Sequence, residues 1–393
     1  MRSNACRVLV LALLLSGGCG EQTSSPVPTG ALRLGAVLGE ADDGTFARAE
    51  APRTFRFPED HGPHPEFRSE WWYLTAVLED EDAQPLGLQF TLFRQALTGS
   101  RTPEGEQTPR PANRWQTPQV YLAHFAVTDT ATGTHESGER FARGHPSLAG
   151  VTVDPFRLWL EDWQIEAQDP TTWHLAVDDG ERAASLELRL TGPIVLQGEG
   201  GLSRKGEGQA SYYYSLPFIE ASGRVRVDGA ERQVRGTAWL DREWSTSMLS
   251  DGQLGWDWFA LSLDDGRRVM LFRLRRADGT RDPFDQGMLA APGKADRALT
   301  AADFDLQPVR GWRDEDGAEW PVGWSVRVGE ETWSVEAVMD DQRMNTSIRY
   351  WEGLVTVRDG TGERIGRGYL ELTGYDRAAS TEIADTGLGG TER

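Results

Sequence analysis

The chain has 393 residues and carries 61 acidic against 41 basic side chains, which gives a formal net charge of −20. Binding to nucleic acid requires neutralised phosphates, and adhesion to anionic lipid headgroups requires basic clusters, so this acidic balance argues against both. The length is sufficient for one or two domains that each bury a core.

Residues 1–19 have the three-part layout of a secretory signal. Arg2 and Arg7 supply a positive start, residues 8–15 form an apolar run, and three small residues precede Cys19. The run is too short to span a bilayer core, which needs roughly 20 apolar residues. We therefore expect a lipoprotein signal peptide at 1–19, with Cys19 as the lipidation site.

Glycine follows Cys19 where an inner-membrane lipoprotein would carry aspartate, so an outer-membrane lipoprotein that faces the periplasm is expected. Its partner would be the membrane, reached through the N-terminal acyl anchor. The alternative is cleavage without lipidation, which would yield a periplasmic or secreted protein. The chain has no cysteine after Cys19, so the mature protein has neither disulfides nor thiol chemistry.

The region after Cys19 is predicted to be a flexible linker over residues 20–50, because it is rich in Ser, Pro, Gly and acidic residues. The Thr- and Gly-rich residues 377–393 are predicted to form a flexible tail. Between them, short runs of Trp, Val, Leu, Tyr and Phe alternate with turn signals, and helical periodicity is nearly absent. The segment 223–236, with two alternating arms around Asp228-Gly229, predicts a β-hairpin. The body is therefore expected to be all-β and antiparallel.

An internal similarity predicts two related domains. Residues 71–80 align without gaps on residues 256–265, and each segment is followed by a strand that contains Phe-Arg. We expect an N-terminal domain over 51–225 and a C-terminal domain over 226–376. Chance likeness between two Trp-rich hairpins is the alternative.

Residues 57–73 gather two histidines, four carboxylates and three adjacent aromatic residues, Trp71, Trp72 and Tyr73. His61 and His64 beside carboxylates could bind zinc or iron, but no further histidine cluster supplies a third ligand, so a structural loop without metal is the preferred interpretation. Strand alternation places Glu70 and Trp72 on one face. A carboxyl beside aromatic rings loses hydration, so the pKa of Glu70 is expected to rise and to favour a general acid. A buried salt bridge from Glu70 to an arginine such as Arg68 or Arg94 is the open alternative.

Residues 236–245 form a second cluster in which Asp241 and Glu243 share one strand face. Charged groups within an aromatic strand are costly unless paired or functional. The two carboxyls could share a proton; a structural ion pair centred on Arg242 is the alternative. Asp257, between two tryptophans, is a third candidate acid.

The segments FPEDHGPHPEFRSEWWY at 57–73, GTAWLDREW at 236–244 and GWDWF at 255–259 resemble the lipocalin-like AttH/CrtC family. This family includes carotenoid 1,2-hydratases and exported proteins described only as predicted secreted hydrolases. The resemblance extends over about 55–375 and implies two lipocalin-like, calycin-type antiparallel β-barrel domains packed together, with a hydrophobic ligand site near where they meet. The hydratases carry histidine at the position of Arg242 and a Tyr-x-Asp near 271–274, and this chain has neither. The resemblance therefore argues against carotenoid hydration itself, and whether the protein is an enzyme stays open.

The leading hypothesis is an exported lipoprotein that binds a hydrophobic isoprenoid or lipid-like ligand and transforms it by acid-assisted addition, isomerisation or hydrolysis. A lipid-binding chaperone without turnover is the alternative, and a carbohydrate-active protein with tryptophans along an open groove is a further one. No cofactor, metal or nucleic acid is expected. The candidate catalytic residues are Glu70, Asp241, Glu243 and Asp257, and the candidate ligand-binding residues are His64, Trp72, Tyr73, Arg94, Trp244, Trp256 and Trp258.

Overall fold

The computed structural model describes residues 44–99, 117–246, 249–250 and 252–375, all within one compact unit, Ala31–Arg393. The predicted signal peptide 1–19, the lipidation site Cys19, most of the predicted linker and the predicted tail 377–393 lie outside the described residues. Within the described ranges, no helix is both long and apolar enough to cross a membrane.

The described end of the predicted linker packs against the body. Phe46 and Ala49 are each only 4% exposed, and Ala49 belongs to the first hydrophobic core. The backbone N–H of Ala47 also donates to the carbonyl of Glu66 over 2.9 Å. Residues 44–50 therefore belong to the body, because two apolar side chains and a backbone bond are enough to hold them there.

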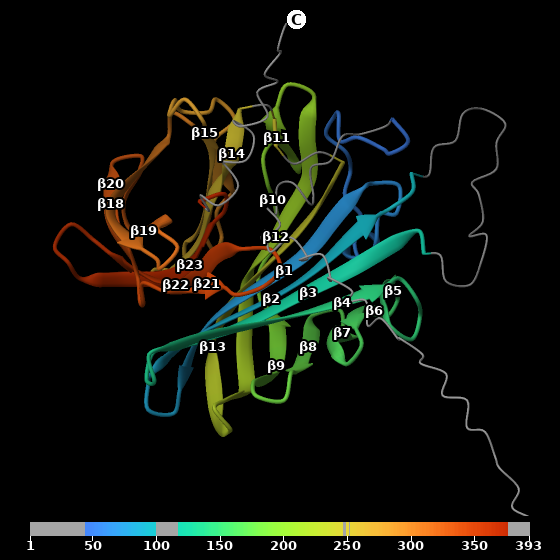
Figure 1. Ribbon diagram of the computed structural model, residues 1–393. Coiled ribbons are helices and arrows are strands. Elements are labelled where there is room, and N and C mark those ends of the chain that lie inside the picture. Colours follow the sequence, from blue (N-terminus) through green and yellow to red (C-terminus); the bar gives the residue numbers. More distant parts are fainter. Residues whose placement is uncertain (1–43, 100–116, 247–248, 251, 376–393) are drawn as a thin grey trace, which may run out of the picture. The chain divides into compact units, whose positions relative to one another are not determined.

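The strands of the described residues form two antiparallel sheets (Figure 1). The first has 13 strands in the order β4-β3-β2-β1-β13-β12-β9-β8-β7-β6-β5, with β10 and β11 both paired to β12. A short 3-10 helix, η1 (Glu59–His61), precedes it. The strand bounds are β1 (Ser69–Asp80), β2 (Pro85–Ala96), β3 (Gln119–Asp129), β4 (Thr134–Arg143), β5 (Ala149–Val153), β6 (Phe156–Leu160), β7 (Trp163–Asp169), β8 (Thr172–Asp178), β9 (Ala183–Leu190), β10 (Val195–Leu196), β11 (Leu202–Gly206), β12 (Gln209–Val227) and β13 (Ala230–Ser245).

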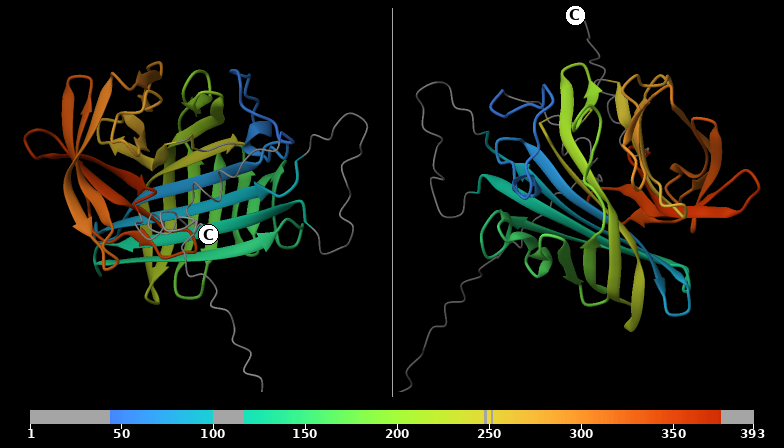
Figure 2. Two further views of the ribbon diagram at one scale, coloured as in Figure 1. Left: turned by 45° about the horizontal axis from the view of Figure 1, so that its top comes forward. Right: turned by 180° about the vertical axis from the view of Figure 1, so that it is seen from behind.

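The second sheet has ten described strands in the order β17-β16-β15-β14-β23-β22-β20-β19-β18, with β21 paired to β22. It curls into a nearly closed ring (Figure 2). Both sheets curve in the manner of lipocalin-like barrels, which confirms the predicted all-β fold. The strand bounds are β14 (Gln253–Leu263), β15 (Arg268–Arg276), β16 (Gln286–Ala290), β17 (Arg297–Thr300), β18 (Phe304–Arg313), β19 (Glu319–Val328), β20 (Glu331–Ala337), β21 (Arg343–Met344), β22 (Tyr350–Arg358) and β23 (Arg364–Leu372).

The change from one sheet to the other lies between Ser245 and Gln253, and not near residue 225. The predicted hairpin at Asp228-Gly229 is confirmed, and both turn residues have positive φ, 50° and 72°. Its second arm, β13, is hydrogen-bonded to β1 as well as to β12, so it belongs to the first sheet. The predicted domain boundary at residue 225 would therefore separate β12 from β13, although these two strands pair along their length.

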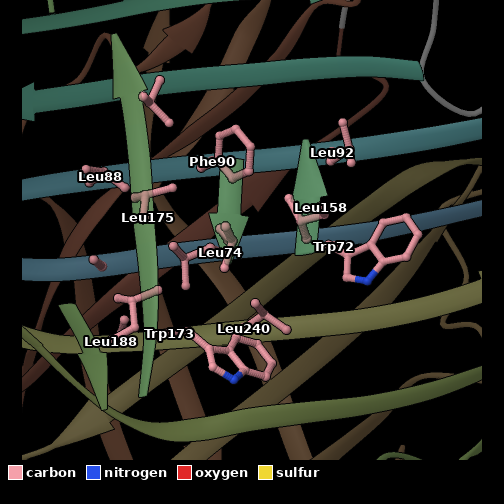
Figure 3. Close-up of a cluster of buried hydrophobic side chains, with 14 of the residues drawn as sticks. Trp72, Leu74, Leu88, Phe90, Leu92, Leu158, Trp173, Leu175, Leu188 and Leu240 are labelled. Atoms are coloured by element: carbon pink, nitrogen blue, oxygen red, sulfur yellow. The ribbon is translucent and has the colours of Figure 1, made fainter. Parts of the chain in front are cut away.

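Strand β1 is buried on both faces, which explains its nearly continuous apolar sequence. Leu74, Ala76 and Leu78 point into the first core, which side chains of β6, β8 and β9 complete (Figure 3). Tyr73 and Val77, on the opposite face, pack instead in a cluster that contains residues of the second sheet. The two sheets therefore share one face of β1.

The two sheets approach each other closely at Gly87 of β2. A Cβ atom at this position would lie 2.4 Å from the hydroxyl oxygen of Tyr369 and 3.1 Å from Cβ of Leu354. Both of these residues belong to the second sheet. The absence of a side chain at residue 87 is therefore what lets the sheets pack here.

The internal similarity is present in the structure, but with a different alignment from the predicted one. In the first sheet Trp71 lies opposite Phe93 of the Phe-Arg strand, and in the second sheet Trp258 lies opposite Phe272. Trp71 thus corresponds to Trp258, not to Trp256. In the same register, Glu70 lies opposite Arg94 and Asp257 opposite Arg273.

Candidate functional site

A cavity of about 50 Å3 lies between the two sheets, and we refer to it as the inter-sheet cavity. Most of its wall is aromatic, and its polar groups come from both sheets. The first sheet contributes Trp71, Tyr73, Phe93, Ser203, Lys205, Tyr213, Asp241 and Glu243, and the second contributes Trp256, Trp258, Phe272, Tyr350 and Glu371.

Asp241 is the central carboxyl of the first-sheet wall and is only 3% exposed. Its Oδ1 accepts hydrogen bonds from Ser215 Oγ over 2.5 Å and Trp239 Nε1 over 2.6 Å, and its Oδ2 accepts from the Tyr213 hydroxyl over 2.5 Å. Burial disfavours the anion more than these donors stabilise it, so the pKa of Asp241 is raised to about 7. Asp241 can therefore hold a proton at neutral pH inside a chamber whose wall is mostly aromatic.

Glu243, two residues further along the same strand face, has a different environment. It forms an ion pair with Lys205 and accepts a hydrogen bond from Ser211. The ammonium nitrogen of Lys205 also lies 5.5 Å from the ring centroid of Trp71 and 5.3 Å from that of Phe272. Asp241 and Glu243 thus share a face, as predicted, but they are held by separate partners.

Glu371 of β23 is the acid of the opposite wall. Its Oε1 accepts a hydrogen bond from Trp256 Nε1 over 2.9 Å. Burial and, to a smaller extent, the negative charges of Asp241 and Glu243 across the cavity raise the pKa of Glu371 to about 7, against the opposing effect of the Trp256 hydrogen bond. The cavity therefore has one carboxyl on each sheet that titrates near neutral pH.

The structure places Glu70 outside this cavity. Its side chain is fully buried on the other face of β1, where it forms ion pairs with Arg94 and Arg242. Burial alone would raise its pKa, but the two guanidinium groups hold the pKa well below its usual range. The predicted rise is wrong, and the alternative of a buried salt bridge is correct, with two arginines in place of one.

His64 and Trp244 belong to the same buried network. Their rings stack with centroids 3.8 Å apart, and the backbone N–H of His64 donates to Glu70 Oε2 over 3.0 Å. Trp72 is 1% exposed. The guanidinium carbon of Arg242 lies over the Trp72 ring, 3.8 Å from the centroid of that ring. His64, Trp72, Arg94 and Trp244, all predicted to bind ligand, therefore pack within the first sheet and do not line the inter-sheet cavity.

Asp257 is the counterpart of Glu70 in the second sheet. It is fully buried, forms an ion pair with Arg273, lies 3.4 Å from Arg275 Nε, and accepts a hydrogen bond from the Tyr375 hydroxyl over 2.8 Å. Its neighbours Trp256 and Trp258 do line the cavity, because alternate residues of a strand point to opposite faces. Of the predicted site residues, the structure brings together Tyr73, Asp241, Glu243, Trp256 and Trp258.

Both histidines of the 57–73 loop have hydrogen-bond partners within the protein. His61 Nδ1 lies 2.6 Å from the Tyr214 hydroxyl, and His64 Nε2 lies 3.0 Å from Asp60 Oδ1. In the part of the chain that the structure describes, no three His, Cys, Asp or Glu side chains are grouped to hold a metal ion.

Three polar residues of the cavity were not predicted from the sequence: Lys205, Tyr213 and Glu371. Glu371 had a usable signal, because a carboxyl within the apolar run 368–372 has the same pattern that singled out Asp241. Lys205 and Tyr213 had none: the glycine-rich stretch before Lys205 looked like a connection, and their approach to the cavity depends on how β11 and β12 pair.

Comparison with known proteins agrees with this architecture. A protein from Nitrosomonas europaea that was assigned as AttH, and whose crystal structure is solved, is 34% identical; the match covers 84% of this chain and 100% of that one, with a TM-score of 0.74. Kievitone hydratase from Nectria haematococca is 13% identical, with a TM-score of 0.60, and the match covers 84% of this chain and 95% of that one. The second likeness concerns the fold alone. No relative is found among curated proteins.

The family model described as AttH-like matches residues 48–375, which include all the strands of both sheets. The resemblance seen in the sequence motifs is thereby confirmed. The chain belongs to the AttH-like family.

Proposed function

We propose that the inter-sheet cavity binds the unsaturated end of a hydrophobic isoprenoid or lipid-like ligand and that Asp241 protonates it. The observation that carries the proposal is the position of Asp241: a carboxyl with a pKa of about 7, buried in a chamber whose walls are mostly aromatic. A general acid works best when its pKa lies near the operating pH. The same protonation would begin an addition, an isomerisation or a hydrolysis.

The aromatic wall supports this chemistry. Protonation of a carbon–carbon double bond leaves a carbocation, and the faces of tryptophan and tyrosine rings attract cations. The ring of Trp258 packs against that of Tyr73, with centroids 5.1 Å apart, and against that of Trp239, with centroids 6.5 Å apart. Tyr73 and Trp258 line the cavity, and Trp239 donates a hydrogen bond to Asp241. The likeness of the fold to a hydratase adds support for water as the group that is added.

The volume of the cavity limits the ligand. About 50 Å3 holds a few water molecules or the end of a hydrocarbon chain, and a complete carotenoid does not fit. Arg242, at the position where the resemblance expects histidine, is bound to Glu70 on the face of β13 that points away from the cavity. Carotenoid hydration by the histidine mechanism is therefore not part of the proposal.

The carbohydrate alternative required tryptophan rings along an open groove. No tryptophan of the described residues is exposed, and Trp72, Trp244 and Trp351 are almost completely buried. These positions favour an apolar ligand.

The test compares Asp241→Asn with the wild-type protein, using two probes. Binding is followed by displacement of cis-parinaric acid, and turnover by incorporation of oxygen-18 from labelled water into geraniol, an isoprenoid alcohol with a branched alkene end. Asp241→Asn should bind either probe as the wild type does and should lose turnover by about 10² to 10⁴-fold.

The matched control is Asp285→Asn. Asp285 is also a buried aspartate, with a pKa raised to about 6, but it lies outside the cavity. Its variant should keep wild-type turnover. Binding without turnover in the wild type would favour the lipid-binding alternative, and failure of both probes to bind would contradict the ligand class.

We also propose that Cys19 is acylated in the cell envelope and anchors the protein in the outer membrane. The proposal rests on the small residues that precede this cysteine and on the net charge of −20, which leaves electrostatic adhesion to anionic lipid unfavourable. The mass of the protein purified from membranes should exceed that of the polypeptide from Cys19 by the acyl groups. Cys19→Ala should release the protein into the soluble fraction; if wild type is already soluble, the anchor is excluded.

A further inference from the structure

Glu352 of β22 is the most unusual buried carboxyl of the described residues. Its exposure is 0%, and neither Oε1 nor Oε2 has a hydrogen-bond partner. Glu70, which is equally buried, is held by two arginines, whereas no ion pair is found for Glu352. An ionised carboxylate without a partner is strongly disfavoured in such a place, which favours the neutral form of Glu352. Its pKa is accordingly raised well above the ordinary value, with burial as the main cause.

Glu352 lies directly opposite Glu371, the acid of the second-sheet wall. The two residues are register partners on the antiparallel strands β22 and β23. Side chains of directly opposed residues share a face of the sheet, with Cβ atoms about 5 Å apart. Glu371 lines the inter-sheet cavity, and Glu352 lies beside it on the neighbouring strand without lining the cavity.

The two carboxyls differ in their donors. Trp256 Nε1 donates to Glu371 over 2.9 Å, which stabilises the Glu371 anion. The hydroxyls of Tyr73 and Tyr350 face Glu352 and lower its pKa in part, but burial outweighs them, and the Tyr350 hydroxyl also lies 2.8 Å from His124 Nδ1. Glu371 is therefore the member of the pair that ionises first, while Glu352 keeps its proton.

The positive group that acts on the pair is Lys205. The titratable groups that face it from the neighbouring strands are Tyr73, Lys205, Asp241, Glu243, Tyr350 and Tyr369. Lys205 is already paired with Glu243. A charge on Glu371 thus has no cation of its own, and a neutral neighbour that can donate a hydrogen bond would stabilise it.

We infer that Glu352 and Glu371 hold one proton between them, and that Glu371 is the second acid–base group of the cavity, opposite Asp241. Glu352 is its positioning residue: its protonated carboxyl has no partner in this structure, and it lies in register with Glu371, so it can donate to the Glu371 carboxylate once that group ionises. The inference rests on the proposed function, because Asp241 supplies the acid to which Glu371 is the complement.

The protons balance for addition of water to an alkene. Asp241 transfers its proton to one alkene carbon, and the π electrons form the new C–H bond. The oxygen of a water molecule then bonds to the other carbon, and Glu371 takes the proton that this water loses. The product has gained H and OH, Asp241 is ionised, Glu371 is neutral, and one proton passed from Glu371 to Asp241 through solvent restores the starting state.

The first test needs no substrate. Infrared spectra of protein labelled with ¹³C-glutamate are recorded at about pH 8, where Asp241 and Glu371 are mostly ionised. The wild type should show the C=O stretch of a neutral glutamic acid that is shifted by the label, and Glu352→Leu should lack it. Absence of this band in the wild type, or its persistence in Glu352→Leu, would overturn the inference.

The second test separates a functional role from a structural one. Glu352→Leu replaces an unpartnered buried carboxyl by an apolar group of similar size, so the unfolding midpoint should stay the same or rise. Its kcat with geraniol should nevertheless fall about tenfold or more, and the pH at which activity rises should move up by about one unit, because Glu371 has lost its donor. Glu352→Gln keeps a donor and should restore most of both.

Glu371→Gln removes the base itself and should lower kcat by about 10² to 10⁴-fold without changing the affinity for cis-parinaric acid. The outcomes distinguish the two proposals. If Asp241→Asn abolishes turnover but Glu371→Gln does not, the carboxyl pair has no role and the proposed function stands. If no variant or wild type turns over the probe, the proposed function fails, and the infrared result alone decides whether the pair holds a proton.

Discussion

The hydroxyl of Tyr213 donates a hydrogen bond to Asp241 Oδ2 over 2.5 Å and lies 3.2 Å from Trp258 Nε1, so one side chain connects the acid of the first sheet with the aromatic wall of the second. This bond favours the ionised form of Asp241 and works against the larger effect of burial. The pKa of Asp241 near 7 thus results from two opposing effects, burial and hydrogen bonding, and a single substitution can shift it.

Tyr213→Phe should raise the pKa of Asp241 further, by about one unit, because the anion loses a donor while burial is unchanged. A titration of ¹³C-aspartate carboxyl signals measures the shift. Tyr212→Phe is the control, since the Tyr212 hydroxyl donates to the carbonyl of Ala51, away from Asp241. An Asp241 pKa that is unchanged or lower in Tyr213→Phe would contradict the balance described here.

Asp241 should make the stability of the protein depend on pH. Its folded pKa of about 7 lies above the ordinary value of 3.8, so the folded state retains a proton that the unfolded state releases. The stability that this proton contributes is complete below about pH 4 and is lost as the pH rises through about 7, by ~4 kcal/mol in total.

Asp241→Asn cannot make this contribution, so the difference in unfolding free energy between wild type and variant should shrink or reverse from about pH 4 to about pH 7. Urea unfolding at both pH values measures it. The wild type has to be compared with the variant because His61 also titrates in this range. Burial lowers the pKa of His61 to about 4, so this group changes the stability in the opposite direction between about pH 4 and pH 7. A difference that is constant with pH would show that Asp241 titrates normally.

Glu70→Gln should destabilise the protein by about 3–5 kcal/mol, because it leaves the guanidinium groups of Arg94 and Arg242 buried without their shared anion. The urea midpoint provides the measurement. Glu220→Gln, which breaks an exposed pair with Arg189, is the control and should cost no more than about 1 kcal/mol. Equal effects of the two substitutions would mean that the buried network does not hold the first sheet together.

Trp258→Leu should weaken the binding of cis-parinaric acid about tenfold, since the ring forms part of the cavity wall between Tyr73 and Trp239. Trp159→Leu, in the first sheet and outside the cavity, should bind as the wild type does. Displacement titrations compare the two. If Trp159→Leu is the weaker binder, the ligand lies elsewhere.

The fold could be predicted because strand alternation and Asp-Gly turns are local signals. The alternation of side chains along a strand also correctly placed Asp241 and Glu243 on one face of β13, and Arg242 and Trp244 on the other. It could not show which face meets a cavity, because β1 and β13 are buried on both faces and each face contains aromatic and charged residues.

The charge state of each acid could not be predicted from the sequence either. Glu70 and Asp241 are both carboxyls in aromatic strands, yet their pKa values move in opposite directions. The difference depends on arginines that strand pairing brings from 24 and 172 positions away in the sequence. A pattern along one strand contains no information on such partners, which explains why Glu70 was predicted as an acid.

The contact of Gly87 with Tyr369 has a consequence for engineering. The residue touches neither Asp241 nor the cavity wall, yet it sets how near the two sheets can come on that side. A larger residue there would hold the two sheets further apart at this point. Because close-packed interiors transmit strain, the inter-sheet cavity would also widen. Ligand size could then be selected from a distance, at a position where no catalytic group has to be altered.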